Sequence, residues 1–77
     1  MKPKQKLFEE IKKLLKKNVT GEEKIDLKKL EIWDSLIYLD LVSTIEQYTK
    51  KKLTAVQIHK ITDSRYLVKT INSFYGK

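Results

Sequence analysis

Apolar residues recur along this chain at the spacing of an amphipathic α-helix, and this periodicity restricts its fold more than any other feature. Near the N-terminus they stand at i, i+1, i+4, i+7 and i+8, as Leu7, Phe8, Ile11, Leu14 and Leu15. That spacing places them on one face of a helix with 3.6 residues per turn. Four lysines fall on the other face: Lys12, Lys13, Lys16 and Lys17. The pattern predicts a core-facing helix over residues 7–17 that ends by residues 18–21.

The size and composition of the chain leave helix packing as its main source of stability. Seventy-seven residues form one small domain, which buries only about 60% of the surface that its unfolded chain exposes. Without cysteine the chain forms no disulfide, and with one histidine it has no zinc-binding cluster. We therefore expect an all-α fold over residues 1–77, a small four-helix bundle of three longer helices and one short helix.

The remaining helices are indicated by their capping residues. Asp34 or Ser35 is an acceptable N-cap for a second long helix, which the lysines at 50–52 close. Thr54 and Gln57 have the spacing of a capping box, so we expect a short helix over residues 55–60. Thr62 and Asp63 are caps for a last helix that reaches Phe74. Residues 22–33 form a structured connection, in which Asp26 caps a short helical turn over residues 27–30.

The second long helix is more apolar than a single core-facing stripe requires. We expect its broad apolar face to consist of Leu36, Leu39, Leu41, Val42, Ile45 and Tyr48. Asp40, Ser43, Glu46 and Gln47 are expected to point mostly outward. Ile37 and Tyr38 make the first turn apolar all round, so an extra face there must meet either the core or a partner.

The positive charge of the chain is unevenly distributed. The formal net charge is +7, yet residues 30–49 contain no lysine or arginine. The acidic residues in that stretch are Glu31, Asp34, Asp40 and Glu46, which give −4, so the other residues together carry +11. The lysines suggest nucleic acid or an anionic surface as a partner, but they avoid the stretch with the most conspicuous motif.

That motif is Asp34-Ser35-Leu36, which follows Trp33 and opens the second long helix. A hydroxyl at a loop-to-helix junction faces the positive end of the helix dipole and backbone N–H groups without helical partners. This is a favourable place to carry a phosphate. We interpret Ser35 as a point of covalent attachment, whereas Ser43, Ser64 and Ser73 lack this setting and are ordinary helix or cap residues.

With these elements in place, residues 30–74 resemble an acyl carrier protein of the phosphopantetheine-binding class. The matching parts are Asp34-Ser35-Leu36, Leu41-Val42 and Ile45-Glu46 along the second helix, then Leu53-Thr54, Lys60-Ile61-Thr62 and residues 67–71. The resemblance implies that a separate phosphopantetheinyl transferase attaches 4′-phosphopantetheine from coenzyme A to Ser35. The thiol of this arm then holds an acyl or aminoacyl group as a thioester.

The resemblance also implies a set of partners and contact residues. A loading ligase and downstream enzymes of a fatty-acid-like, polyketide or other specialised pathway would meet the chain around Ser35. The expected contact residues are Asp34, Leu36, Ile37, Asp40, Leu41 and Ile61. Leu36 and Leu41 are expected in the core as well. Ile37 stands where many fatty-acid carriers have an acidic residue, and the chain is basic, which favours a dedicated carrier in a specialised pathway.

Other functions are less favoured by the sequence. The alternative is a small basic helical module that binds nucleic acid or an anionic surface, but Arg65 is the sole arginine, which argues against a recognition helix for nucleic acid. A serine hydrolase needs a base and an orienting group, and the lone His59 does not supply both, so we expect no enzyme. No apolar run approaches a membrane span or a signal segment. We expect a cytoplasmic monomer without a metal.

Overall fold

The chain forms a small all-α bundle, as the sequence predicts. A computed structural model describes residues 3–19 and 22–75. Within these residues lie four α-helices, α1 (Pro3–Leu15), α2 (Ser35–Thr49), α3 (Ala55–Lys60) and α4 (Ser64–Phe74), and one 3₁₀ turn, η1 (Leu27–Lys29). Across the same residues, no helix combines the length and the apolar character needed to cross a membrane.

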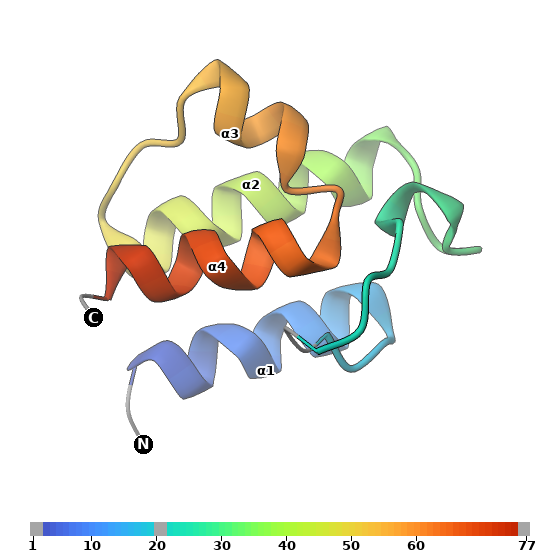
Figure 1. Ribbon diagram of the computed structural model, residues 1–77, viewed down its shortest axis with the longest axis horizontal. Helices are drawn as coiled ribbons and strands as arrows, with labels where there is room; N and C mark the ends of the chain where they lie inside the picture. The colour runs from blue at the N-terminus through green and yellow to red at the C-terminus, as the bar shows by residue number, and fades with distance from the viewer. Residues whose placement is uncertain (1–2, 20–21, 76–77) are drawn as a thin grey trace.

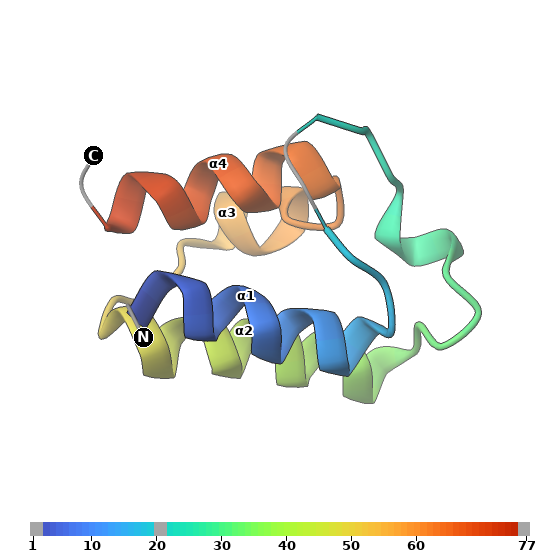
Figure 2. The ribbon, with the colours of Figure 1, turned by 90° about the horizontal axis from the view of Figure 1, so that it is seen from below.

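Three long helices run side by side, and the short one covers one side of the bundle. α1 packs along α2 in the opposite direction, whereas α4 runs in the same direction as α2 (Figures 1 and 2). The end of α1 and the start of α2 therefore lie at the same end of the molecule. We call this end, where Ser35 begins α2, the Ser35 end.

The core lies between the inward faces of the helices and of the connection before α2. Its fully or almost fully buried side chains are Leu7, Ile11, Leu15, Val19, Leu27, Leu41, Ile45, Leu53, Ile61, Leu67 and Ile71. The residues of α1 and α4 in this set recur every four positions, which is the spacing of a stripe along a helix. The periodicity in the sequence thus predicted the buried face of α1.

The predicted bounds of α1 were shifted from those in the structure. The helix begins at Pro3, because proline is tolerated in the first turn, where its missing N–H has no helical partner. It ends at Leu15, before the predicted end at residue 17, because Lys16 adopts a left-handed conformation with φ 54°. Of the predicted terminating segment, residues 20 and 21 lie outside the described part of the chain.

The prediction that Leu36 and Leu39 belong to the inward face of α2 was wrong. Leu36 is 69% exposed and Leu39 is 62% exposed, whereas Leu41 and Ile45 are fully buried. At about 100° per residue, Leu39 lies roughly 200° and Leu36 roughly 140° around the helix from Leu41. Only one side of α2 meets the bundle, so both leucines face away from it.

The short helix α3 has the bounds and the cap that the sequence predicts. The Thr54 hydroxyl accepts a hydrogen bond from Gln57 N–H (3.1 Å), and the Gln57 side-chain oxygen accepts one from Thr54 N–H (2.9 Å). This reciprocal pair is the capping box. The loop before α3 is fixed by Glu46, whose carboxylate accepts a hydrogen bond from Leu53 N–H (2.8 Å). Glu46 is thus half-buried and not outward-facing, which corrects the prediction.

The connection between α1 and α2 is held against the start of α4. Asp26 caps η1, as predicted, by accepting a hydrogen bond from Lys28 N–H (3.1 Å). Backbone hydrogen bonds join Leu27 N–H to the Thr62 carbonyl (2.7 Å) and Ser64 N–H to the Ile25 carbonyl (2.9 Å). The connection is therefore structured, and it delivers the chain to the start of α2.

Candidate functional site

The candidate site is the first turn of α2, where the structure places Ser35 as the first helical residue. Asp34, and not Ser35, is the N-cap, with its carboxylate accepting a hydrogen bond from Ile37 N–H (2.9 Å). Ser35 is exposed, and within residues 3–19 and 22–75 no hydrogen bond engages its hydroxyl. The hydroxyl is thus accessible to a reagent from solvent.

The backbone around Ser35 offers donors to an anion. The first helical hydrogen bond runs from Tyr38 N–H to the Asp34 carbonyl (3.0 Å). The N–H groups of Ser35 and Leu36 precede that bond, so the helix itself gives them no acceptor. Together with the positive end of the helix dipole, they favour a negative group on the Ser35 oxygen. A phosphodiester at Ser35 fits these residues.

Aromatic side chains fix the turn that carries Ser35. Trp33 is half-buried, and its ring lies 5.5 Å from the Tyr38 ring, centroid to centroid, with the planes tilted by 44°. The Tyr38 hydroxyl donates a hydrogen bond to the Ile58 carbonyl of α3 (2.7 Å). Tyr38 therefore joins the start of α2 to α3, and the extra apolar face expected in this turn meets the protein itself.

The predicted contact residues divide into exposed and buried groups. Asp34, Leu36 and Asp40 are exposed near Ser35, and Ile37 is half-buried. Leu41 and Ile61, in contrast, are fully buried in the core and present no surface to a partner. This corrects the prediction for both: Leu41 lies on the inward side of α2, and Ile61, at the end of α3, turns into the bundle.

Sequence reasoning missed one exposed residue of this surface. Leu39 is one turn along α2 from Leu36, and both are large exposed apolar side chains. Val56 on α3 is also exposed, at 59%. The signal was present in the spacing, since residues 36, 39, 40 and 43 share a helix side opposite Leu41. Leu39 also ends the apolar run of residues 36–39, and this run obscured the signal.

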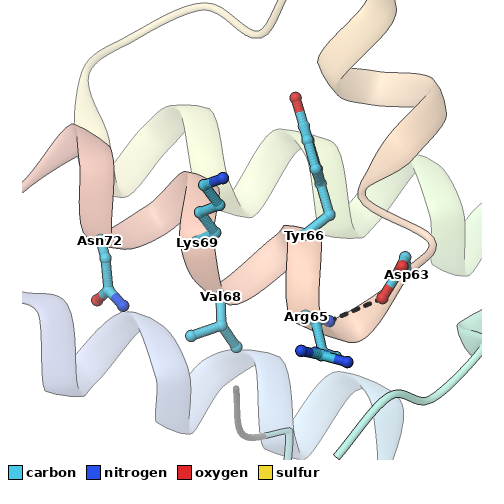
Figure 3. A pocket seen from close by; sticks show the side chains of 6 residues that line it. All are labelled: Asp63, Arg65, Tyr66, Val68, Lys69 and Asn72. Carbon is cyan, nitrogen blue, oxygen red and sulfur yellow. Dashed lines mark hydrogen bonds between the residues drawn. The ribbon is translucent and has the colours of Figure 1, made fainter. Parts of the chain in front are cut away.

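The groove drawn in Figure 3 has no lining residue from α2. It runs along α4 with a volume of about 520 Å³ and is lined by Asp63, Arg65, Tyr66, Val68, Lys69 and Asn72. Asp63 caps α4 by accepting a hydrogen bond from Arg65 N–H (2.9 Å). The Asn72 side chain accepts one from the Lys4 ammonium of α1 (2.9 Å). Ser35 is not part of this groove.

The described residues gather no metal site. No group of three or more His, Asp or Glu side chains within residues 3–19 and 22–75 could hold a metal ion. His59 is exposed near the end of α3. Ser35 supplies the candidate site with an accessible alcohol at a helix start.

Comparisons with known proteins add no identification. No family model matches the chain, no curated protein is similar to it, and no solved structure resembles it at a significant level.

Proposed function

We propose that the protein is a carrier that holds acyl or aminoacyl groups on a 4′-phosphopantetheine arm attached to Ser35. The observation that carries the proposal is the exposed, unengaged Ser35 hydroxyl in the first turn of α2. The sequence resemblance supports the same residue. When attached, the group supplies a thiol for thioester formation, so a chain without cysteine needs no thiol of its own.

The residues of the chain have distinct roles in this proposal. The Ser35 oxygen forms the phosphate ester, and the N–H groups of Ser35 and Leu36 favour its negative charge by about 0.3–1 kcal/mol in this exposed setting. Asp34 keeps the helix start in place through its bond to Ile37 N–H. Because a carboxylate beside a phosphate is repelled by it, Asp34 acts through this cap and through partner recognition.

The surface next to Ser35 supports transient partner contact. Leu36 and Leu39 are exposed on the side of α2 that also carries Asp40. Leu36 and Leu39 are neighbours at i and i+3 of the helix, and an exposed apolar patch rimmed by polar residues marks a site that binds other proteins. Partner enzymes, among them a phosphopantetheinyl transferase and a loading ligase, would reach Ser35 across this surface.

The proposal is tested by intact-mass analysis after incubation with coenzyme A and a promiscuous phosphopantetheinyl transferase. We expect the mass of exactly one phosphopantetheinyl group to be added to the wild-type protein and none to the Ser35→Ala variant. Ser43→Ala is the matched control, because Ser43 is another exposed serine of α2, and it should be modified like the wild type. If several transferases of different specificity leave the wild-type protein unmodified, the proposed function is wrong.

A further inference from the structure

The exposed lysines at the end of α1 and directly after it line a groove at the Ser35 end. Its volume is about 520 Å³, and its lining residues are Glu9, Lys12, Lys13, Lys16, Lys17 and Asn18. We call it the lysine groove. Four lysines and one glutamate give its lining a net charge of +3. Glu10 approaches Lys13 (3.9 Å), but both side chains are well exposed, so this pair neutralises little of the field.

A second groove extends the lysine groove toward Ser35. Its volume is about 450 Å³, and it shares Lys16 and Lys17 with the first. Its other lining residues are Leu15 and the segment Leu30, Glu31 and Ile32, which lies directly upstream of the motif that carries Ser35. In both views the end of α1 and the start of α2 lie at the same end of the molecule (Figures 1 and 2). A partner that reaches Ser35 from this side therefore meets lysines.

Three acidic residues of the neighbouring stretch also lie near Ser35. Glu31, Asp34 and Asp40 are exposed there, although the Asp34 carboxylate also caps α2. Glu46 is in the last turn of α2, at the other end of that helix. Positive charge at the Ser35 end is therefore concentrated in the lysine groove, whose lining carries +3.

The geometry of α1 favours a protein partner over a membrane or a nucleic acid. A helix that lies in a bilayer surface inserts its apolar face, but Leu7, Ile11 and Leu15 are at most 1% exposed in the core. Arginine, which suits phosphate recognition best, is absent from the lining, and Arg65 lies in the groove along α4.

The geometry points to the lysine groove as the docking site for an acidic segment of a partner protein. The occupant is a helix or loop rich in aspartate and glutamate, whose carboxylates pair with Lys12, Lys16 and Lys17. Electrostatic complementarity of this kind guides encounter and fixes orientation more than it adds affinity. The inference depends on the proposed function in one respect: it assumes that this partner acts at Ser35.

The test is a titration of the full chain at low salt with a synthetic peptide rich in aspartate and glutamate, followed by backbone NMR. We expect the amide shifts to change at residues 12–18 and 30–32. Replacing Lys12, Lys16 and Lys17 together by glutamate should weaken binding by about tenfold or more, the equivalent of about 1.4 kcal/mol or more. Random duplex DNA and anionic phosphatidylglycerol vesicles serve as competing probes.

The matched control replaces Lys50, Lys51 and Lys52 together by glutamate. Both triple variants make the same charge change near a helix C-terminus, and each includes one lysine with positive φ, Lys16 or Lys50. We expect the control to bind the peptide with at most a modest loss. If reversal to glutamate unfolds either protein, as judged by circular dichroism, the corresponding glutamine triples replace them.

Two outcomes would overturn the inference. Equal weakening in both triples would show that net charge alone, and not the groove, attracts the peptide. Tighter binding of DNA or vesicles than of the peptide at residues 12–18 would assign the groove to a different class of partner. Neither outcome depends on modification of Ser35, so the inference and the proposed function can fail separately.

Discussion

At the scale of single residues, Ser64 shows how one buried hydroxyl can fix a long connection. The side chain is fully buried at the start of α4. Its oxygen accepts a hydrogen bond from Ile25 N–H (2.8 Å), and its hydroxyl donates one to the Glu23 carbonyl (2.9 Å). We expect Ser64→Ala to lower the free energy of unfolding by about 1–2 kcal/mol, because both backbone groups lose their partner in a partly buried place.

Urea denaturation followed by circular dichroism measures this loss. Ser43→Ala is the control, because Ser43 is exposed on α2, and its free energy of unfolding should stay within about 0.5 kcal/mol of the wild type. Equal stability of Ser64→Ala and the wild type would mean that the connection is held without this hydroxyl. The sequence did not predict the role of Ser64, because its partners lie 39 and 41 residues away.

At the scale of helices, local signals in the sequence predicted caps, and tertiary contacts decided orientation. Thr54 and Gln57 are three residues apart and determine the start of α3 by themselves. Asp26 predicted η1 for the same reason. The orientation of α2 could not be predicted in the same way, because Leu39 and Leu41 are equally apolar and only the position of α1 and α4 makes one of them inward. Hence the structure was needed to show that Leu39 belongs to the exposed surface beside Ser35.

The ends of α2 and α4 are joined by a tyrosine, which predicts a pH dependence. The Tyr75 hydroxyl donates a hydrogen bond to the Tyr48 carbonyl (3.1 Å). Burial, and then repulsion from Tyr48, raises the pKa of Tyr75 above its usual value of 10.0. Because the folded state holds this proton more tightly than the unfolded state, the stabilisation is fully present below pH 10 and is lost as the pH rises through the folded pKa.

The variant Tyr75→Phe isolates this contribution. At neutral pH it should be less stable than the wild type by about 0.5 kcal/mol, the low end for a hydrogen bond, since the tyrosine is only half-buried. Above pH 10 the difference in unfolding free energy between the two proteins should shrink. Urea denaturation at both pH values measures it. A difference that stays constant or widens would contradict the proposed role of the phenol proton.

At the scale of the whole molecule, an excess of positive charge is confined to a small volume. The net charge is +7, and the chain extends over 31 × 25 × 19 Å. At an ionic strength of about 0.01 M the Debye length is about 30 Å, so charges across the entire fold repel each other, whereas at 0.15 M it is about 8 Å. The ion pair between Glu10 and Lys13 offsets little of this repulsion, because it is exposed.

Adding sodium chloride over this range should therefore stabilise the protein. We expect the melting temperature to rise by about 5 °C, which corresponds to about 1 kcal/mol for a domain of this size. The double variant Lys51→Gln/Lys52→Gln lowers the net charge to +5 at two exposed positions. It should melt at a higher temperature than the wild type at low salt and gain less from added salt. A melting temperature that falls with salt would mean that attraction between charges outweighs repulsion in the folded state.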